Sequence, residues 1–305
     1  MRLSVTAKTA LIAVTLCFSA VAHGQDQPIR NIEQITDNLY RVQNNGHFTV
    51  FLVTPEGIIV SDTINRDFSE WLLAELDSRF GVPVRYVAYS HHHWDHASGG
   101  QVFANTANFY GHESVVAAMA MPPGDTTLSG DPAGMDRNGN GTIERSEAGG
   151  NLAAQFDNYD EDGDGALTGA EIARGPIADV HPPDRYYSDR ATISLGGNSL
   201  ELIHVTTPHS PDMTVLRFPQ EDAVFFVDFL SLRRVPFTTI PGYDLAGLLN
   251  GIRAVEAMDF SIAVGGHGAV GTMQDVIDHR RYLEELRDAV AAGIADGDSL
   301  EEIQA

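Results

Sequence analysis

Apolar runs near the start of the chain predict three β-strands, over residues 47–53, 57–62 and 84–90. Each run has the length of a buried strand and is rich in β-branched and aromatic residues. Between the last two runs, apolar side chains recur at helical spacing and predict a helix with one apolar face: Phe68, Trp71, Leu72, Leu76 and Phe80. Strand, helix and strand in succession indicate a layered α/β fold.

The second half of the chain continues this pattern. Strands are predicted over residues 191–194, 200–206, 213–218 and 223–226. Residues 272–295 predict an amphipathic helix that begins with a capping box formed by Thr272 and Asp275. Its apolar stripe consists of Val276, Leu283, Leu286, Val290 and Ile294.

The composition changes abruptly between these halves. Residues 122–176 are rich in Gly, Asp, Asn and Glu and lack the strand pattern on either side. We therefore expect an insertion into a single α/β domain formed by residues 25–121 and 177–305.

The first 24 residues have the features of a signal peptide. Arg2 and Lys8 precede an apolar run at 10–22 that is too short for a comfortable membrane span, and cleavage is expected after Ala22 or Gly24. We therefore expect a periplasmic or secreted protein with no stable membrane anchor after cleavage. The single cysteine, Cys17, lies in this run, so the mature chain has no thiol ligand and no disulfide.

The charge of the chain bears on its partners. With 19 basic and 42 acidic residues, the formal net charge is −23. Such a chain repels phosphate backbones, so we expect a small-molecule substrate rather than a nucleic acid. The sequence leaves the oligomeric state open.

A cluster of metal-binding side chains directly follows the strand predicted at 84–90. His91 and His93 are two residues apart and point the same way in extended chain, so they can bind one metal together. Asp95 and His96 point elsewhere and suit a second metal nearby. Imidazole and carboxylate without sulfur favour zinc, with iron or manganese as alternatives.

The string HHHWDHASGG at 91–100 resembles the His-x-His-x-Asp-His signature of the metallo-β-lactamase superfamily, and especially the hydroxyacylglutathione hydrolases (glyoxalase II). It is also similar to exported hydrolases of the same fold. The resemblance covers residues 34–120 and 184–305. It implies an αββα sandwich, into which the acidic segment is inserted.

The resemblance also assigns roles to residues elsewhere in the chain. Asp62 matches an aspartate that supports a metal ligand, and Asp228 matches the carboxylate that bridges two metals, although Val227 replaces the usual preceding Gly. The first metal would have three histidine ligands: His91, His93 and His209. The second metal would have Asp95, His96 and His267.

These assignments imply a hydrolase. Two metals about 3.5–4 Å apart can hold a bridging water and lower its pKa from ~15.7 towards ~7. Asp95 would then orient this water or relay its proton during attack on a polarised carbonyl. The expected substrate is a β-lactam, lactone, ester or thioester. Export favours small extracellular molecules over glutathione thioesters.

Two other functions stay open at this point. One is an iron-dependent redox member of the superfamily similar to persulfide dioxygenases. A flavodiiron site is disfavoured, because that family has Glu at the position of His93. The other is a calcium-dependent binding module on an inactive hydrolase scaffold.

The remaining histidines suggest structural roles. His92 and His204 are expected to pack or to support neighbouring groups. No partner can be assigned from the sequence to four others: His47, His112, His181 and His279.

The acidic segment contains two matches to the twelve-residue calcium loop of EF-hand proteins. The first loop spans residues 136–147, with Asp136, Asn138, Asn140, Thr142, Glu144 and Glu147. The second loop spans residues 160–171, with Asp160, Asp162, Asp164, Ala166, Thr168 and Glu171. Ile143 and Leu167 occupy the position at which paired loops form a short β contact. We expect up to two calcium ions.

The surroundings of these loops differ from those of calcium sensors. Pro122, Pro123 and a Gly-rich run predict no good incoming helix, and Gly175 with Pro176 ends the outgoing helix early. Without long helices to open, the loops favour a structural role for calcium, and the segment is expected to cap the mouth of the metal site.

Overall fold

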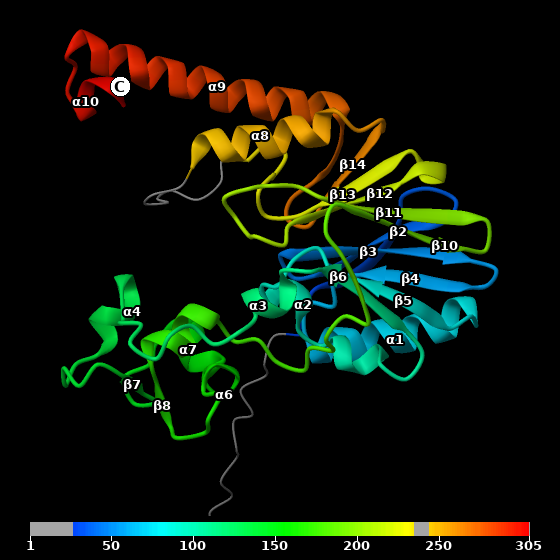
Figure 1. The fold of residues 1–305 in the computed structure, drawn as a ribbon, viewed down its shortest axis with the longest axis horizontal. Coiled ribbons are helices and arrows are strands. Elements are labelled where there is room, and N and C mark those ends of the chain that lie inside the picture. Colours follow the sequence, from blue (N-terminus) through cyan, green and yellow to red (C-terminus); the bar gives the residue numbers. More distant parts are fainter. Residues whose placement is uncertain (1–26, 235–243, 305) are drawn as a thin grey trace, which may run out of the picture.

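The computed structural model describes residues 27–234 and 244–304, and its strands form two large sheets that pack face to face (Figure 1). The first sheet has seven strands in the order β1 (Arg30–Gln34), β2 (Leu39–Asn44), β3 (His47–Thr54), β4 (Gly57–Ser61), β5 (Val84–Ala88), β6 (Asn108–His112) and β9 (Arg185–Tyr187). The second has six, in the order β10 (Arg190–Leu195), β11 (Asn198–His204), β12 (Thr214–Phe218), β13 (Ala223–Phe226), β14 (Ile262–Gly265) and β15 (Val270–Thr272).

Each sheet contains parallel strands beside antiparallel hairpins. Strands β4, β5, β6 and β9 run parallel to one another, and so do β13 and β14. The carboxyl ends of parallel strands lie at the same edge of a sheet. The loops that leave these edges carry the metal-binding residues described below.

The two faces of the first sheet bury different cores. Val50 and Leu52 of β3 join the core between the sheets, whereas Phe51 points the other way into the core under the first long helix. That helix, α1 (Arg66–Phe80), begins at Asn65, whose side chain accepts a hydrogen bond from the Phe68 N–H. It covers the outer face of the first sheet (Figure 1).

Two further helices cover the second sheet and complete the αββα sandwich (Figure 1). They are α8 (Leu245–Glu256) and α9 (Met273–Asp296). The capping box of α9 is present, since the Asp275 carboxylate accepts hydrogen bonds from the backbone and hydroxyl of Thr272. A short helix, α10 (Leu300–Ile303), follows.

The apolar stripe predicted on α9 is buried only in its first half. Val276 and Leu283 are buried, whereas Leu286, Val290 and Ile294 are 44%, 36% and 66% exposed. The reason is the length of α9, which extends past the end of the second sheet (Figure 1).

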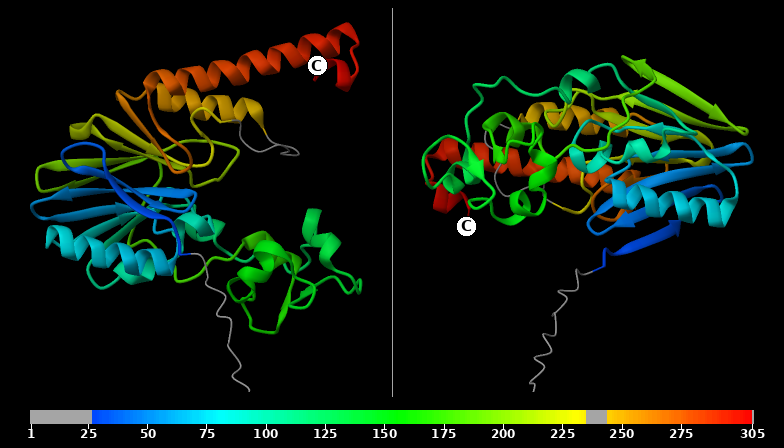
Figure 2. Two further views of the ribbon diagram at one scale, coloured as in Figure 1. Left: turned by 180° about the vertical axis from the view of Figure 1, so that it is seen from behind. Right: turned by 90° about the horizontal axis from the view of Figure 1, so that it is seen from below.

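The elements of residues 122–176 lie beside the sandwich rather than within either sheet (Figure 2). They are α4 (Gly130–Met135), β7 (Ile143–Glu144), α5 (Gly150–Ala154), α6 (Phe156–Tyr159), β8 (Ala166–Leu167) and α7 (Gly169–Arg174). Ile143 pairs with Leu167, as the loop pattern predicts. One expectation is wrong: a helix, α4, does precede the first loop, because the chain turns helical after Ser129 despite its glycines.

Short helices connect the sheets to the sites. They are α2 (Trp94–Ala97), η1 (Gly100–Phe103), α3 (Val115–Ala118) and η2 (Pro219–Glu221). The predicted signal peptide with Cys17 falls within residues 1–26, outside the described residues. No helix in the described parts of the chain has the length and apolarity needed to cross a bilayer.

Candidate metal centre

The predicted metal ligands converge at one end of the sandwich. His91, His93, Asp95 and His96 follow β5, and Asp228 and His267 follow the parallel strands β13 and β14. His209 comes from the loop between β11 and β12. Both sheets therefore contribute ligands, which places the cluster where their edges meet.

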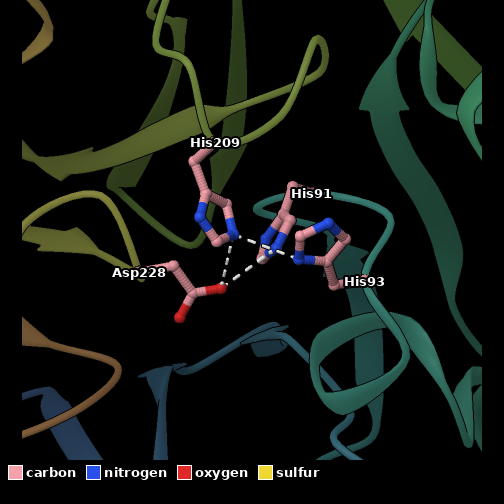
Figure 3. A group of neighbouring side chains, drawn as sticks. All are labelled: His91, His93, His209 and Asp228. Atoms are coloured by element: carbon pink, nitrogen blue, oxygen red, sulfur yellow. Dashed lines mark hydrogen bonds and ion pairs between the residues drawn. The ribbon is translucent and has the colours of Figure 1, made fainter. Parts of the chain in front are cut away.

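The first set of ligands, here called the inner group, consists of His91, His93, His209 and Asp228. One ligand atom from each lies within 4.8 Å of all the others. The Asp228 Oδ2 atom is 3.1 Å from His91 Nε2 and 3.0 Å from His209 Nε2 (Figure 3). His93 Nδ1 lies 3.0 Å from His209 Nε2 (Figure 3).

A second set, the middle group, consists of His96, Asp228 and His267. His96 Nε2 is 3.3 Å from Asp228 Oδ2, and His267 Nε2 is 2.8 Å from Asp228 Oδ1. Asp95 Oδ2 lies 3.6 Å from His96 Nε2 and 3.9 Å from His267 Nε2. The Asp228 carboxylate thus lies between the two groups, and it belongs to both.

The donor atoms in this cluster fit a cation better than they fit one another. His91 Nε2 and His96 Nε2 are buried and lack a partner in hydrogen-bond geometry, although both lie within 3.3 Å of the Asp228 carboxylate. A buried polar atom without a partner costs free energy. A metal ion with imidazole and carboxylate ligands would satisfy both nitrogens, and this donor set suits zinc.

Comparison with known proteins agrees with this geometry. The family model of the metallo-beta-lactamase superfamily matches residues 64–267, which is more than half of the chain. The chain belongs to the metallo-beta-lactamase superfamily.

A metallo-beta-lactamase from Pontibacter korlensis is similar in structure, with a TM-score of 0.57 and 15% sequence identity. The match covers 84% of this chain and 99% of that protein. At this identity the similarity shows a shared metallo-beta-lactamase fold. A search of curated proteins finds no significant match.

Two residues of this superfamily site have strained or tightly packed backbones. Asp228 has a φ of 55°, in the left-handed region that few residues other than Gly adopt. Val227, which replaces the Gly expected before it, fits because Gly266 faces it: a Cβ on Gly266 would lie 2.4 Å from Val227. The loops that carry Asp228 and His267 are therefore packed against each other.

Asp62 lies behind the cluster and is fully buried. One carboxylate oxygen accepts a hydrogen bond of 2.7 Å from the Ser90 N–H, and the other accepts from the Ser90 hydroxyl and from His96 Nδ1 at 2.8 Å. Because a carboxylate only accepts, His96 must carry its proton on Nδ1. Its Nε2 atom, which faces Asp228, is then the atom of this ring that could bind a cation.

The electrostatics of the cluster prepare His93 and Asp95, but not His96, for a cation. Burial tends to lower the pKa of His96, but the charges of Asp228 and Asp95 outweigh it and raise that pKa well above its usual value, so a cation must displace a proton from it. Burial, followed by the charges of His91 and His209, lowers the pKa of His93 to about 3, so this ligand is neutral at pH 7. Burial tends to raise the pKa of Asp95, but the nearby His96 and His47 outweigh it and hold that pKa below its usual value. Metals bind neutral imidazole and ionised carboxylate.

The other histidines have partners that the sequence alone did not reveal. His47 Nε2 lies 3.2 Å from Asp95 Oδ2, His112 stacks on His204 with ring centres 4.0 Å apart, and His181 stacks on Phe109. His279 is buried in α9. Without knowledge of the hairpin that brings β3 to the site, nothing in the sequence linked His47 to Asp95.

His92 points to a different set of groups from its two neighbours. Its Nδ1 lies 2.9 Å from the buried carboxylate of Asp212 and 3.2 Å from the Ser210 hydroxyl. Ser210 also bonds to Asp212. These contacts fix the backbone between His91 and His93, in line with the supporting role expected for His92.

The second predicted calcium loop brings carboxylates together. Ligand atoms of Asp160, Asp162 and Glu171 lie within 4.8 Å of one another, and Asp160 Oδ1 is buried without a partner. Glu171 also caps α7 by accepting hydrogen bonds from Thr168. Asp164 accepts a hydrogen bond from the N–H of Ala166.

The first calcium loop is more completely bonded within itself. Asp136 accepts hydrogen bonds from three backbone N–H groups, and Glu147 accepts from those of Arg137, Asn138 and Glu144. The Glu144 carboxylate accepts from the amide groups of Asn138 and Asn140, and Asn140 in turn accepts from Thr142. Fewer carboxylate oxygens are left to converge on one point than in the second loop.

Proposed function

We propose that this chain is an exported, di-zinc hydrolase of a carboxyl derivative. The observation that carries the proposal is the shared position of Asp228 between the inner and middle groups. Two adjoining donor sets joined by one carboxylate support two neighbouring cations rather than one. For this reason we favour a di-zinc site over the single iron of a persulfide dioxygenase-like enzyme.

Each residue of the site would have a distinct part in hydrolysis. When bound, two zinc ions would polarise a carbonyl and acidify water to a pKa of ~7. The inner group would hold one ion, and Asp95, His96 and His267 would hold the other, with Asp228 shared. Asp95, at 17% side-chain exposure, would orient the attacking water and accept its proton.

The proposed substrate is a β-lactam, lactone, ester or thioester from outside the cytoplasm. The net charge of −23 disfavours polyanionic substrates such as nucleic acids. The local similarity to glyoxalase II supports thioester chemistry, whereas a predicted signal peptide disfavours glutathione as the carrier.

The test combines metal analysis with a substrate screen. Purified mature protein should contain two zinc ions per chain and hydrolyse a member of a panel of β-lactams, lactones, esters, thioesters and sulfate esters. His96→Ala should abolish that activity and leave the fold intact. A single iron would favour the redox alternative, and full activity in His96→Ala would reject the middle group as part of the site.

We further propose that the loops at 136–147 and 160–171 bind calcium and that the ion has a structural role. The carboxylates of the second loop, with the buried and unpartnered Asp160 Oδ1, support this proposal. The outgoing helix α7 has six residues and ends at Gly175, so it cannot expose a large groove as a sensor does. Calcium titration of the metal-free protein, followed by calorimetry, measures the number of sites. If calorimetry detects no heat of calcium binding, both the proposed calcium sites and the alternative of a calcium-dependent binding module are rejected.

A further inference from the structure

His47 belongs to a third set of donor atoms, here called the outer group, with Asp95 and His267. Single ligand atoms from these three residues lie within 4.8 Å of one another. His47 Nε2 is 3.2 Å from Asp95 Oδ2, and its ring centre is 5.0 Å from that of His267. Two imidazoles and one carboxylate form a set that binds zinc, iron or manganese.

The backbone holds His47 in this position. It is the first residue of β3, after a turn in which Asn45 has a φ of 57°. The neighbouring Gly46 carbonyl accepts a hydrogen bond of 3.2 Å from His267 Nδ1, and the Phe48 N–H donates to the Gly266 carbonyl at 2.8 Å. The hairpin is thus bonded to the loop that carries His267.

Arg41 also connects the hairpin to the loop that carries His267. Its guanidinium donates to the carbonyls of Gly265 and Gly268 and stacks on the Phe48 ring at 3.5 Å. The hydrogen bond that His267 Nδ1 donates to the Gly46 carbonyl fixes the tautomer of His267, because a carbonyl accepts only from a protonated Nδ1. The Nε2 atom of His267, 2.8 Å from Asp228 Oδ1 and 3.9 Å from Asp95 Oδ2, is therefore the atom of this ring that could bind a metal.

The outer group is more open than the middle group. The side chains of His47, Asp95 and His267 are 30%, 17% and 21% exposed, whereas His96 is 1% exposed. Asp95 and His267 face His47 on one side, and His96 and Asp228 on the other. A cation bound by Asp95 and His267 therefore has a further imidazole within reach on the solvent side.

We propose that His47 is a further protein ligand of the second cation, which it binds together with Asp95 and His267. This inference rests on the proposed two-zinc function. It adds to the expected ligand set a residue from the first hairpin of the chain, far in sequence from the signature motif. The cation would then have ligands on the solvent side of the site as well as on its buried side.

Zinc titration of the full mature chain, in saturating calcium, tests the proposal through the His47→Ala and His47→Gln variants. Gln keeps a side-chain donor that can hydrogen-bond Asp95 but removes the imidazole nitrogen. We expect both variants to keep the first zinc and to lose at least tenfold in affinity for the second. The visible spectrum of the cobalt-substituted protein should lose the bands of the second ion only. His181→Gln, which removes a histidine outside all ligand groups found in the described residues, is the matched control.

The outcomes separate the two proposals. If wild type binds two zinc ions and both variants bind the second as tightly, His47 is not a ligand and the two-zinc function stands. If Ala weakens the second ion while Gln does not, His47 acts only through its hydrogen bond to Asp95 and the proposal fails. If the wild type binds three ions and the variants lose only the third, His47 is not a ligand of the second cation and the proposal fails. If wild type binds at most one cation, the proposed function itself fails.

Discussion

The metal cluster and the two predicted calcium loops bring similar donor atoms together from different parts of the chain. The cluster takes its ligands from loops between residues 91 and 267 and lies between two sheets with large buried cores. Each calcium loop takes its ligands from twelve consecutive residues and lies against a small cluster with five buried apolar side chains: Ile143, Leu152, Phe156, Tyr159 and Leu167. The cluster is organised by the fold, whereas we expect the proposed calcium ions to help order the loops.

This difference predicts where metal removal acts. The sheets bury enough apolar surface to stay folded without zinc, and their ligands pair with Asp228 and Asp62 in the absence of an ion. The segment at 122–176 has little core of its own, so we expect its stability to depend on the proposed calcium ions.

Replacement of Asp228 by Asn should have the largest effect. The change removes the negative charge that the two proposed cations would share, and removal of supporting groups alone typically costs about 10–100-fold in metal affinity. We therefore expect more than about 100-fold weaker binding of both zinc ions, measured by competition titration with a zinc chelator. Asp222→Asn is the matched control, since Asp222 has a similar φ of 52° far from the ligands. Tight binding of even one ion in Asp228→Asn would contradict the bridging role.

Calcium removal should come next. An ion present at about 100 times its Kd stabilises the form that binds it by about 2.7 kcal/mol. In chelator, we expect a lower melting temperature and rapid proteolysis between Pro122 and Pro176, with the sandwich still folded. Limited proteolysis followed by mass spectrometry locates the cuts. An unchanged melt and an uncut segment would show that the loops need no ion.

The same contrast explains what the sequence could predict. The calcium loops and the 91–96 motif are local patterns, so each residue in them could be named from the chain alone. Strands β3 to β5 and helix α1 were predicted for the same reason. The pattern analysis missed α8, although Leu248, Leu249, Ile252 and Val255 recur along it at helical spacing. It did not predict β1, β2, β6, β14 and β15 either, because their short or mixed apolar runs can be recognised as strands only once they pack in the two sheets. His209, Asp228 and His267 were assigned by family resemblance. His47 was missed because only the β2–β3 hairpin brings it to Asp95.

We expect a smaller effect of calcium on Trp94, which links the predicted calcium loops to the metal cluster. Helix α7 ends at Gly175, where a Cβ would lie 3.2 Å from the Trp94 ring, and the Ala178 carbonyl accepts a hydrogen bond from Gly99 just after the ligand-bearing helix α2. Calcium binding to the second loop should therefore alter the surroundings of Trp94. In Trp71→Phe, which leaves Trp94 as the only tryptophan, we expect calcium to shift the emission maximum by a few nanometres.

Variants of the two loops sharpen this experiment. In the Trp71→Phe background, Glu171→Gln should abolish the shift, whereas Glu147→Gln in the first loop should leave most of it. Trp94→Phe, which retains Trp71 on α1, should show no response. A full shift in Glu171→Gln would mean that the second loop is not coupled to α2.

The smallest effect concerns the stacked pair His112 and His204, which joins β6 of one sheet to β11 of the other. Burial, followed by the charge of His112, lowers the pKa of His204, and the nearby Asp189 and Asp212 only partly oppose this. The native state therefore binds fewer protons here than the unfolded chain, so this site lowers stability as pH falls below the ordinary histidine pKa of about 6.5. His204→Gln should lose less stability than wild type between pH 7 and pH 5, by at most about 2 °C in melting temperature. Because His204 is outside both metal regions, the difference should persist with zinc and calcium removed, and its disappearance in chelator would assign the acid sensitivity to the metal ligands instead.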